Sequence, residues 1–282
     1  MKRITIYAML TILIAMASCE KFTQEEAETG STKVGDAHGN VELHLDSCPQ
    51  QRLSIAFFQD DKKVKNIHTL MEELPENLVK ISLPEGSYQV VAIAHNGEGN
   101  CTISSPQKIT FTNNKVTDTS YLYDTLEVGA SHVSKNLCLK RAVATFKLNL
   151  TESLTDEMQQ LKFYYTGGSS TFNAHTGFGC VNSRQTEYRA INPQVSDYYV
   201  YTFPHKEKKV LKMVITVQDN KQNDIKEETL ENVPVVANDT TLYRGNFETS
   251  FSEENGSNTD INFDFEDTWK ENEDVPFFHK SR

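Results

Sequence analysis

Short stretches in which apolar and polar residues alternate, each closed by a turn signal, constrain the fold of this chain more than any other feature. The stretch Val79–Leu83 alternates at every position, and the turn sequence PEG follows it at once. After the turn, apolar residues recur at every second position, at Tyr88, Val90, Ala92 and Ala94. This is the spacing of a strand with one face in a core, and two such stretches around a turn indicate a hairpin.

The same signals predict strands along most of the chain. Further strands are predicted at residues 41–45, 53–58, 121–128, 161–165, 198–203, 210–218, 240–249 and 261–265. The stretch NLCLKRAVATFKLNL, residues 136–150, is predicted to be the longest strand, and its alternate residues from Leu139 to Asn149 would share one face. Residues 67–74 fit a helical turn or a strand, and the residues after Thr155 favour a short capped helix. We therefore predict an all-β protein with minor α-helical content.

These strands fall into two groups, which predicts two tandem β-sandwich domains. The length of 282 residues agrees, because one domain takes about 150 residues. We predict an N-terminal domain at residues 37–135, a C-terminal domain at 136–268 and an acidic tail at 269–282. The polar sequence ASHVSKN, residues 130–136, is interpreted as the linker between the domains.

The N-terminus has the pattern of a secretory signal. Lys2 and Arg3 precede the uncharged apolar run Ile4–Ala17, which is shorter than the about 20 residues of a membrane-spanning helix. The sequence MASC resembles a bacterial lipobox, whose cysteine is acylated and becomes the first residue of the mature chain. We predict a lipoprotein signal peptide at residues 1–18, cleaved after Ser18, and an N-palmitoyl, S-diacylglycerol Cys19. The alternative is an ordinary signal peptide with a coincidental cysteine.

Residues 19–36 are predicted to form a flexible tether, because they are small and polar. Two or more acyl chains hold a protein stably on a bilayer, since each buried methylene contributes about 0.8 kcal/mol. The acidic residues Glu25, Glu26 and Glu28 resemble the surface-export signals of Bacteroidetes lipoproteins, although a solvated linker explains them as well. The expected location is the cell outer membrane, with the protein lipid-anchored and facing the surface.

Four further cysteines follow the predicted lipidation site: Cys48, Cys101, Cys138 and Cys180. An even number in a disulfide-permissive compartment is compatible with one or more disulfides, and the sequence leaves all pairings open. Their wide spacing excludes a CxxC zinc or redox motif. Cys138 lies in a strand-like run, where a small buried hydrophobic residue is an equally good interpretation.

No motif of enzymatic, metal or cofactor chemistry is present. The eight histidines show no HxxxH spacing, and the GxSxG and GxxxxGK[ST] motifs are missing. The sequence GFGCVNS, residues 177–183, is interpreted as a β-loop, and the acidic DFEDTWKENED lacks the oxygen spacing of an EF-hand. We predict no enzyme, no cofactor, no metal and no small-molecule substrate. The formal net charge of −11 opposes nucleic-acid binding, which requires basic surfaces.

Several stretches together resemble the FimB/Mfa2 family of fimbrial anchor lipoproteins in Bacteroidetes. They are the lipobox and tether, LVKISLPEGSYQVVAIAHNGEG, CLKRAVATFKLNL and INFDFEDTW, and they cover most of residues 19–269. The most specific motifs are LPxGxYxVVA and LxRAVA, the latter formed by Leu139, Arg141, Ala142, Val143 and Ala144. One departure is Ile93, where the family often has an aromatic residue.

The resemblance implies two transthyretin-like sandwich domains, with Cys19 matching the lipidated cysteine and no catalytic residues. It implies a protein that holds the base of a fimbria by strand exchange with fimbrial subunits, and that in some members limits fimbrial length. Its partners would be fimbrial subunits and outer-membrane lipid. Candidate donor residues are Ile261, Phe263 and Phe265 in the segment after Ser250, unless they form the protein's own last strand.

Other functions stay open at this point. A fimbrial stalk or tip subunit is one alternative; stalk precursors are cut after an arginine near their first strand, and Arg52 is the first arginine after the lipobox. A glycan-binding surface lipoprotein would need an aromatic platform. The sequence offers Trp269, its single tryptophan, or the tyrosines Tyr164 and Tyr165, or Tyr198, Tyr199 and Tyr201. A hydrolase built from distant residues is a third. Thr125 and Thr240 each follow an aspartate in a short pattern typical of Bacteroidetes O-glycosylation.

Overall fold

A computed structural model describes residues 40–46, 48–150, 155, 157–245 and 268–269 of the protein, and these belong to one compact unit, Lys33–Arg282. The strands up to residue 141 are β1 (Val41–Leu45), β2 (Arg52–Gln59), β3 (Lys62–Leu70), β4 (Leu78–Ile81), β5 (Gly86–His95), β6 (Thr102–Ser105), β7 (Lys108–Thr110), β8 (Thr119–Val128), β9 (Val133–Leu137) and β10 (Lys140–Arg141).

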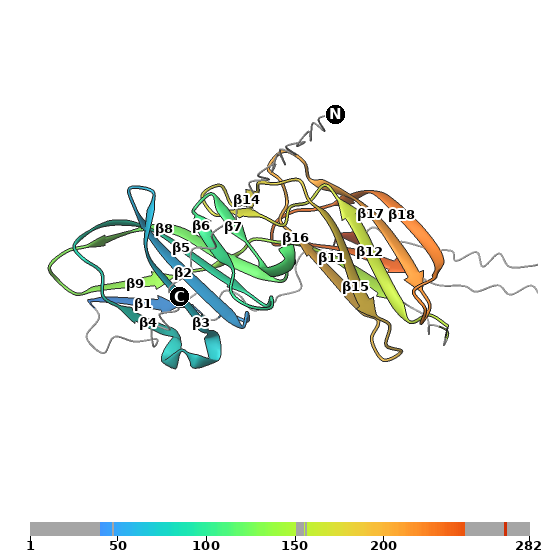
Figure 1. Ribbon diagram of the computed structural model, residues 1–282, viewed down its shortest axis with the longest axis horizontal. Coiled ribbons are helices and arrows are strands. Elements are labelled where there is room, and N and C mark those ends of the chain that lie inside the picture. The colour runs from blue at the N-terminus through green and yellow to red at the C-terminus, as the bar shows by residue number, and fades with distance from the viewer. Residues whose placement is uncertain (1–39, 47, 151–154, 156, 246–267, 270–282) are drawn as a thin grey trace, which may run out of the picture. The chain divides into compact units, whose positions relative to one another are not determined.

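The later strands complete an arrangement of several separate sheets (Figure 1). They are β11 (Ala144–Leu150), β12 (Gln160–Thr166), β13 (Phe172–Asn173), β14 (Phe178–Gly179), β15 (Arg184–Ala190), β16 (Asp197–Thr202), β17 (Val210–Gln218), β18 (Asp224–Pro234), β19 (Thr240–Gly245) and β20 (Thr268–Trp269). The helical elements of the described residues are short 3-10 turns: η1 (Met71–Glu73), η2 (Pro75–Asn77) and η3 (Thr112–Asn114). The all-β prediction is confirmed.

A first hydrophobic core lies among the strands of two sheets, with the orders β4-β1-β9 and β10-β8-β5-β2-β3. The predicted hairpin strand is β5, and its alternate residues Tyr88, Val90, Ala92 and Ala94 all contribute to this core. The intervening Val91 and Ile93 are fully buried as well, but in another cluster. The strand is therefore buried on both faces, because a different hydrophobic cluster covers each face.

A second core lies among the strands of the sheets β16-β11-β19-β20 and β15-β12-β17-β18. The ring of Phe146 in β11 packs 6.2 Å from that of Phe163 in β12, centroid to centroid. Burial alternates along both strands, as the period of a half-buried strand requires. Four-stranded sheets of this kind leave their outermost strands with an open side, which matters for partner binding.

A small sheet with the order β14-β13-β7-β6 joins early and late parts of the chain, since Phe172 of β13 pairs with Ile109 of β7. Its side chains enter a third cluster, in which the rings of Phe111, Phe172 and Phe203 pack together. The predicted domain ranges, 37–135 and 136–268, stay predictions.

The predicted long strand at residues 136–150 is wrong. This stretch forms the end of β9, the short β10 and then β11, which pair with β1, with β8, and with β16 and β19, respectively. Ala142 and Val143 belong to the third cluster, whereas Phe146 and Leu148 belong to the second core. The stretch is apolar because it passes between cores, and not because one strand continues through it.

The predicted linker at residues 130–136 is also wrong in its second half. Residues 133–137 form β9, which runs parallel to β1 from Val41↔Val133 to Leu45↔Leu137. Polar residues are tolerated there because β9 is an edge strand whose burial alternates along its length. The polarity that indicated a linker is the exposed side of this strand.

Two further differences concern the second core. Residues 157–159 do not form the predicted helix; the Met158 N–H donates to the Thr155 carbonyl 3.0 Å away in a turn. The longest described strand, β18, was not predicted, because Val233 is its only buried residue and many of the others are charged. The predicted strand at 261–265 lies outside the described residues, although β20 pairs antiparallel with β19 just after it.

No helix in the described part of the chain is long and apolar enough to cross a membrane.

Candidate functional site

The predicted lipidation site, Cys19, lies outside the described residues, as do the tether at 20–36 and the candidate donor residues Ile261, Phe263 and Phe265. The other four cysteines are free thiols. Cys101 is buried and Cys48 partly so, whereas Cys138 and Cys180 are exposed. The interpretation of Cys138 as a small buried hydrophobic residue is therefore wrong, because it sits between two edge strands.

The thiol of Cys101 is poorly suited to nucleophilic chemistry. Burial raises its pKa to about 11, so the thiolate is scarce at neutral pH. Its neighbour Ser54 approaches His68, with 2.8 Å between Ser54 Oγ and His68 Nδ1. Ser54 is fully buried in β2, and a serine nucleophile needs contact with a substrate. This serine–histidine pair is therefore part of the packed interior.

His95, at the end of the hairpin strand β5, also lies inside the protein. Its ring packs edge-on against Phe111, and its Nδ1 accepts a hydrogen bond from the Gly97 N–H at 3.1 Å. Burial, reinforced by the Arg52 cation, lowers the pKa of His95 to about 4. The ring is thus neutral at physiological pH. Within the described ranges, no group of three or more His, Cys, Asp or Glu side chains could hold a metal ion.

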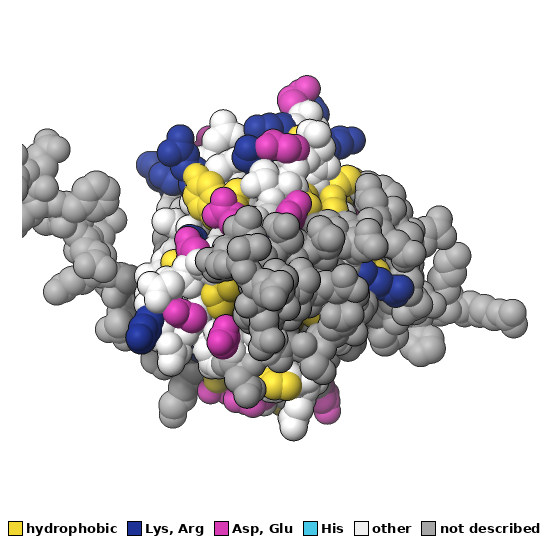
Figure 2. Space-filling model, turned by 90° about the vertical axis from the view of Figure 1, so that its right-hand side faces the viewer, with side chains coloured by type: hydrophobic (Ala, Val, Ile, Leu, Met, Phe, Trp, Pro, Cys, Tyr) yellow, Lys and Arg dark blue, Asp and Glu magenta, His cyan; other side chains and the backbone are white. Residues whose placement is uncertain are grey.

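The surface itself carries charges of both signs. On the face drawn in Figure 2, hydrophobic side chains show as separate small areas among Lys, Arg, Asp and Glu side chains. The coloured part of this face therefore carries charges of both signs side by side. A local feature of the described residues is a cleft beside strand β15.

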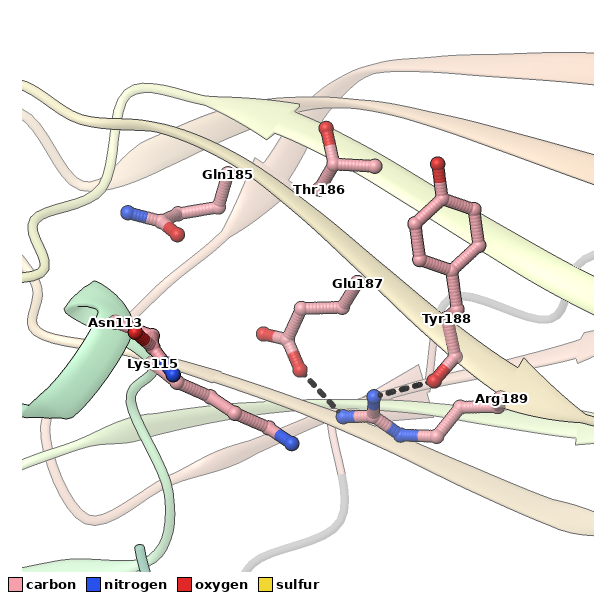
Figure 3. A pocket seen from close by; sticks show the side chains of 7 residues that line it. All are labelled: Asn113, Lys115, Gln185, Thr186, Glu187, Tyr188 and Arg189. Carbon is pink, nitrogen blue, oxygen red and sulfur yellow. Dashed lines mark hydrogen bonds and ion pairs between the residues drawn. The ribbon is translucent and has the colours of Figure 1, made fainter. Parts of the chain in front are cut away.

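This cleft, which we call the β15 cleft, has a volume of about 310 Å³. Five consecutive residues of β15 line it, from Gln185 to Arg189, and Asn113 and Lys115 form the other wall (Figure 3). Because side chains alternate across a strand, a cavity lined by consecutive residues lies along the strand's edge and not against one face. β15 pairs with β12 alone among the described strands, so this edge is open.

A buried carboxylate organises the β15 cleft. Glu187 is 7% exposed, and its Oε1 accepts a hydrogen bond from the Tyr165 hydroxyl at 2.9 Å. Its Oε2 forms an ion pair with Arg189 Nη2 at 2.5 Å. Burial, together with the Glu187 carboxylate, raises the pKa of Tyr165 well above its usual value. The phenol therefore stays protonated and keeps donating to Glu187.

Arg189 bridges the open side between two edge strands. Its Nη1 donates to the Tyr188 carbonyl of β15 at 2.9 Å, and its Nη2 donates to the Tyr199 carbonyl of β16 at 2.8 Å. Together with Glu187, these acceptors occupy the guanidinium. The guanidinium therefore links β15 to β16 beside this edge.

Lys115 is the cation of the β15 cleft that stays available. It extends from the loop after η3 toward the Glu187–Arg189 pair, and it makes no ion pair with any described residue (Figure 3). The cleft thus has two cations for one carboxylate, although the whole chain has a formal net charge of −11. Tyr188, which is 52% exposed, presents its ring on the outer side of the same strand.

Sequence reasoning did not identify this site. The sequence RQTEYRA gave no strand signal, because polar residues occupy both of its faces. Its one clue is a glutamate and an arginine two residues apart, which places both on the same side of a strand. The two candidate glycosylation sites differ in access: Thr125 is exposed in β8, whereas Thr240 is half-buried at the start of β19.

Comparison with known proteins identifies a family and several solved structures. The model of a family described as "Family of unknown function (DUF6562)" matches residues 19–277. Among curated proteins, none matches the sequence.

The solved structures to which the chain is similar include the following three. One is a proposed adhesin from Bacteroides ovatus, with 13% identity, 68% of this chain and 81% of that chain covered, and a TM-score of 0.48. A proposed polysaccharide-binding protein (DUF1812) from Bacteroides thetaiotaomicron has 10% identity, coverage of 74% and 91%, and a TM-score of 0.47. The fimbrial anchor protein Mfa2 from Porphyromonas gingivalis has 12% identity, coverage of 76% and 92%, and a TM-score of 0.40.

Proposed function

The chain belongs to the DUF6562 family of unknown function, and from this premise we propose that it is a lipid-anchored protein of the outer membrane that holds the base of a fimbria at the cell surface. In this proposal Cys19 carries the lipid, residues 19–36 form the tether, and the sheets of the folded part contact fimbrial subunits. The protein acts by binding and not by catalysis. It also limits fimbrial length.

The observation that carries this proposal is the order of the parts along one chain. A lipobox and a polar tether precede a folded body made of β-sheets. Two motifs resemble those of fimbrial anchor lipoproteins. The hairpin motif LPxGxYxVVA lies in β5 and the turn before it, and the LxRAVA motif lies where the chain passes from one hydrophobic cluster to the next. The first motif thus forms the middle strand of the five-stranded sheet, and the second contributes buried residues to two clusters.

Strand addition provides a physical means of holding a subunit. An extended segment that joins the free edge of a sheet gains a row of main-chain hydrogen bonds, and its alternate side chains give specificity. Edge strands of sufficient length are available, since β15 has seven residues and β16 has six. The lipid provides the second attachment, and two acyl chains suffice for stable membrane binding.

The position of Arg52 argues against the alternative role of a stalk subunit. This residue begins the central strand β2, and its Nε donates to the Gly97 carbonyl at 3.1 Å. Cleavage after it would separate β1, whose Val41 and Leu43 are fully buried in the first core, from the rest of the chain. An anchor keeps its chain intact, which agrees with this packing.

The test uses the full chain in the bacterium that produces it. Cys19→Ala should move the protein from the membrane fraction to the soluble fraction and should release fimbriae from the cells, measured by fractionation and electron microscopy. Cys180→Ala, which removes an exposed free thiol, is the matched control and should change neither. Fimbriae that stay cell-bound and of normal length in cells lacking the protein would refute the proposal.

A further inference from the structure

The edge strands of this protein differ in how well they can accept another strand. β3 and β18 are long, but the register of each is interrupted, once at Phe57/Phe58 and twice in the pairing of β17 with β18. Both also carry rows of charged side chains, which are lysines at the start of β3 and mainly glutamates in β18. Bulges and charges of this kind oppose edge-to-edge pairing. β15 pairs with β12 over seven residues without a shift.

The shape of the β15 cleft fits an extended chain. Its lining runs from Gln185 to Arg189, and five residues of strand span about 16 Å. Asn113 and Lys115 face this edge from the other side, so an incoming segment would lie between the backbone of β15 and these two side chains (Figure 3). A cleft bounded on one side by strand backbone offers main-chain hydrogen bonds to its occupant.

The charges of the β15 cleft select among extended segments. Arg189 is already occupied by Glu187 and by two carbonyl oxygens, whereas Lys115 makes no ion pair with a described residue. A segment with an acidic side chain toward Lys115 would neutralise this ammonium. A basic side chain at the same place would meet two cations, and such repulsion excludes wrong partners.

We propose that the β15 cleft is a docking site for an extended segment of another protein chain, which pairs with the free edge of β15 and places an acidic side chain against Lys115. This inference rests on the proposed function, because it locates where a fimbrial subunit would be held. The Glu187–Arg189 pair serves as a positioning element, because Arg189 links the Tyr188 carbonyl of β15 to the Tyr199 carbonyl of β16 beside this edge.

The test is site-specific photo-crosslinking in the full lipidated chain, expressed in the cells that carry the fimbria. A crosslinking amino acid replaces Thr186, an exposed residue of β15, and in a matched control it replaces Thr229, an exposed residue of the edge strand β18. The crosslinked peptide is identified by mass spectrometry. The variants Lys115→Glu, Lys115→Arg and, as a charge-matched control in a turn remote in sequence, Lys221→Glu are compared at position 186.

We expect position 186 to crosslink to a segment of another protein that carries Asp or Glu, and position 229 to give no such product. Lys115→Glu should lower the yield about tenfold, because it converts attraction into repulsion at an interface, while Lys115→Arg and Lys221→Glu should leave it within about twofold. Unchanged thermal unfolding of the Lys115 variants would show that the fold is intact.

Equal yields at positions 186 and 229, or a yield that does not respond to Lys115→Glu, would overturn the proposal. So would a crosslink to a second copy of this chain or to a polysaccharide. The failure of the anchor function is a separate result. If Cys19→Ala leaves fimbriae attached while the Lys115-dependent crosslink persists, then the docking site stands and the anchoring role falls.

Discussion

The two outer strands of one four-stranded sheet, β15 and β18, show how differently a protein can treat its edges. β18 has 11 residues, two interruptions of register and acidic side chains along its length, so its edge resists pairing. β15 has a regular register and a cleft along its edge, with a buried ion pair turned inward. Surface charges oppose strand pairing at β18, whereas at β15 the charged side chains of Glu187 and Arg189 pair with each other. This difference is the reason that we propose β15 as the partner-binding edge of this sheet.

The largest expected effect comes from the core that both edges share. Phe163 in β12 is fully buried and packs against Phe146. Phe163→Ala should lower the free energy of unfolding by about 4 kcal/mol, because it removes a large side chain and leaves a cavity. Urea denaturation measures the loss, and hydrogen exchange should show β15 and β18 losing protection together. Loss confined to one edge would mean that the two strands do not depend on a common core.

A smaller effect should separate the two edges. Glu187→Ala leaves the Arg189 guanidinium without its carboxylate and the Tyr165 hydroxyl without its acceptor, so the free energy of unfolding should fall by about 3 kcal/mol. Glu231→Ala on β18 removes the exposed ion pair with Lys212 of β17 and should change the free energy of unfolding by less than about 1 kcal/mol. Chemical denaturation compares the two variants, and equal losses would contradict the distinction between the edges.

The smallest expected effect is a pH dependence at the β15 edge. The pKa of Tyr165 in the folded protein lies well above the ordinary value of 10.0, so the folded state holds this proton more tightly than the unfolded state. The resulting stability is complete below pH 10 and is lost as the pH rises above it. Tyr165→Phe should reduce the slope of this loss, measured by denaturation between neutral pH and pH 11. Tyr188→Phe, at an exposed side chain, is the control. An identical slope in the wild type and Tyr165→Phe would refute the assignment.

The sequence predicted most of the strands whose buried residues form the cores. The hairpin strand β5 and the strands β2, β12, β16 and β17 lie within a few residues of where the pattern placed them. It failed at two polar edge strands. β9 and β18 present polar residues on their exposed sides, and this polarity resembles that of a linker or a loop. The prediction for residues 136–150 was wrong for the opposite reason. The apolar residues of this stretch follow one another in the sequence but contribute to different cores.

The sequence by itself determined the all-β class and the central strands, because burial of one face enforces a period of two along the chain. Its lipobox also gave the prediction that the chain is held by Cys19. Only the tertiary structure decided which strands lie at edges and what surrounds them. Lys115 and Glu187 are 72 positions apart in the sequence, yet they line one cleft. Strand pairing is a long-range interaction, so an edge, and any site built on it, exists only after the sheets have formed.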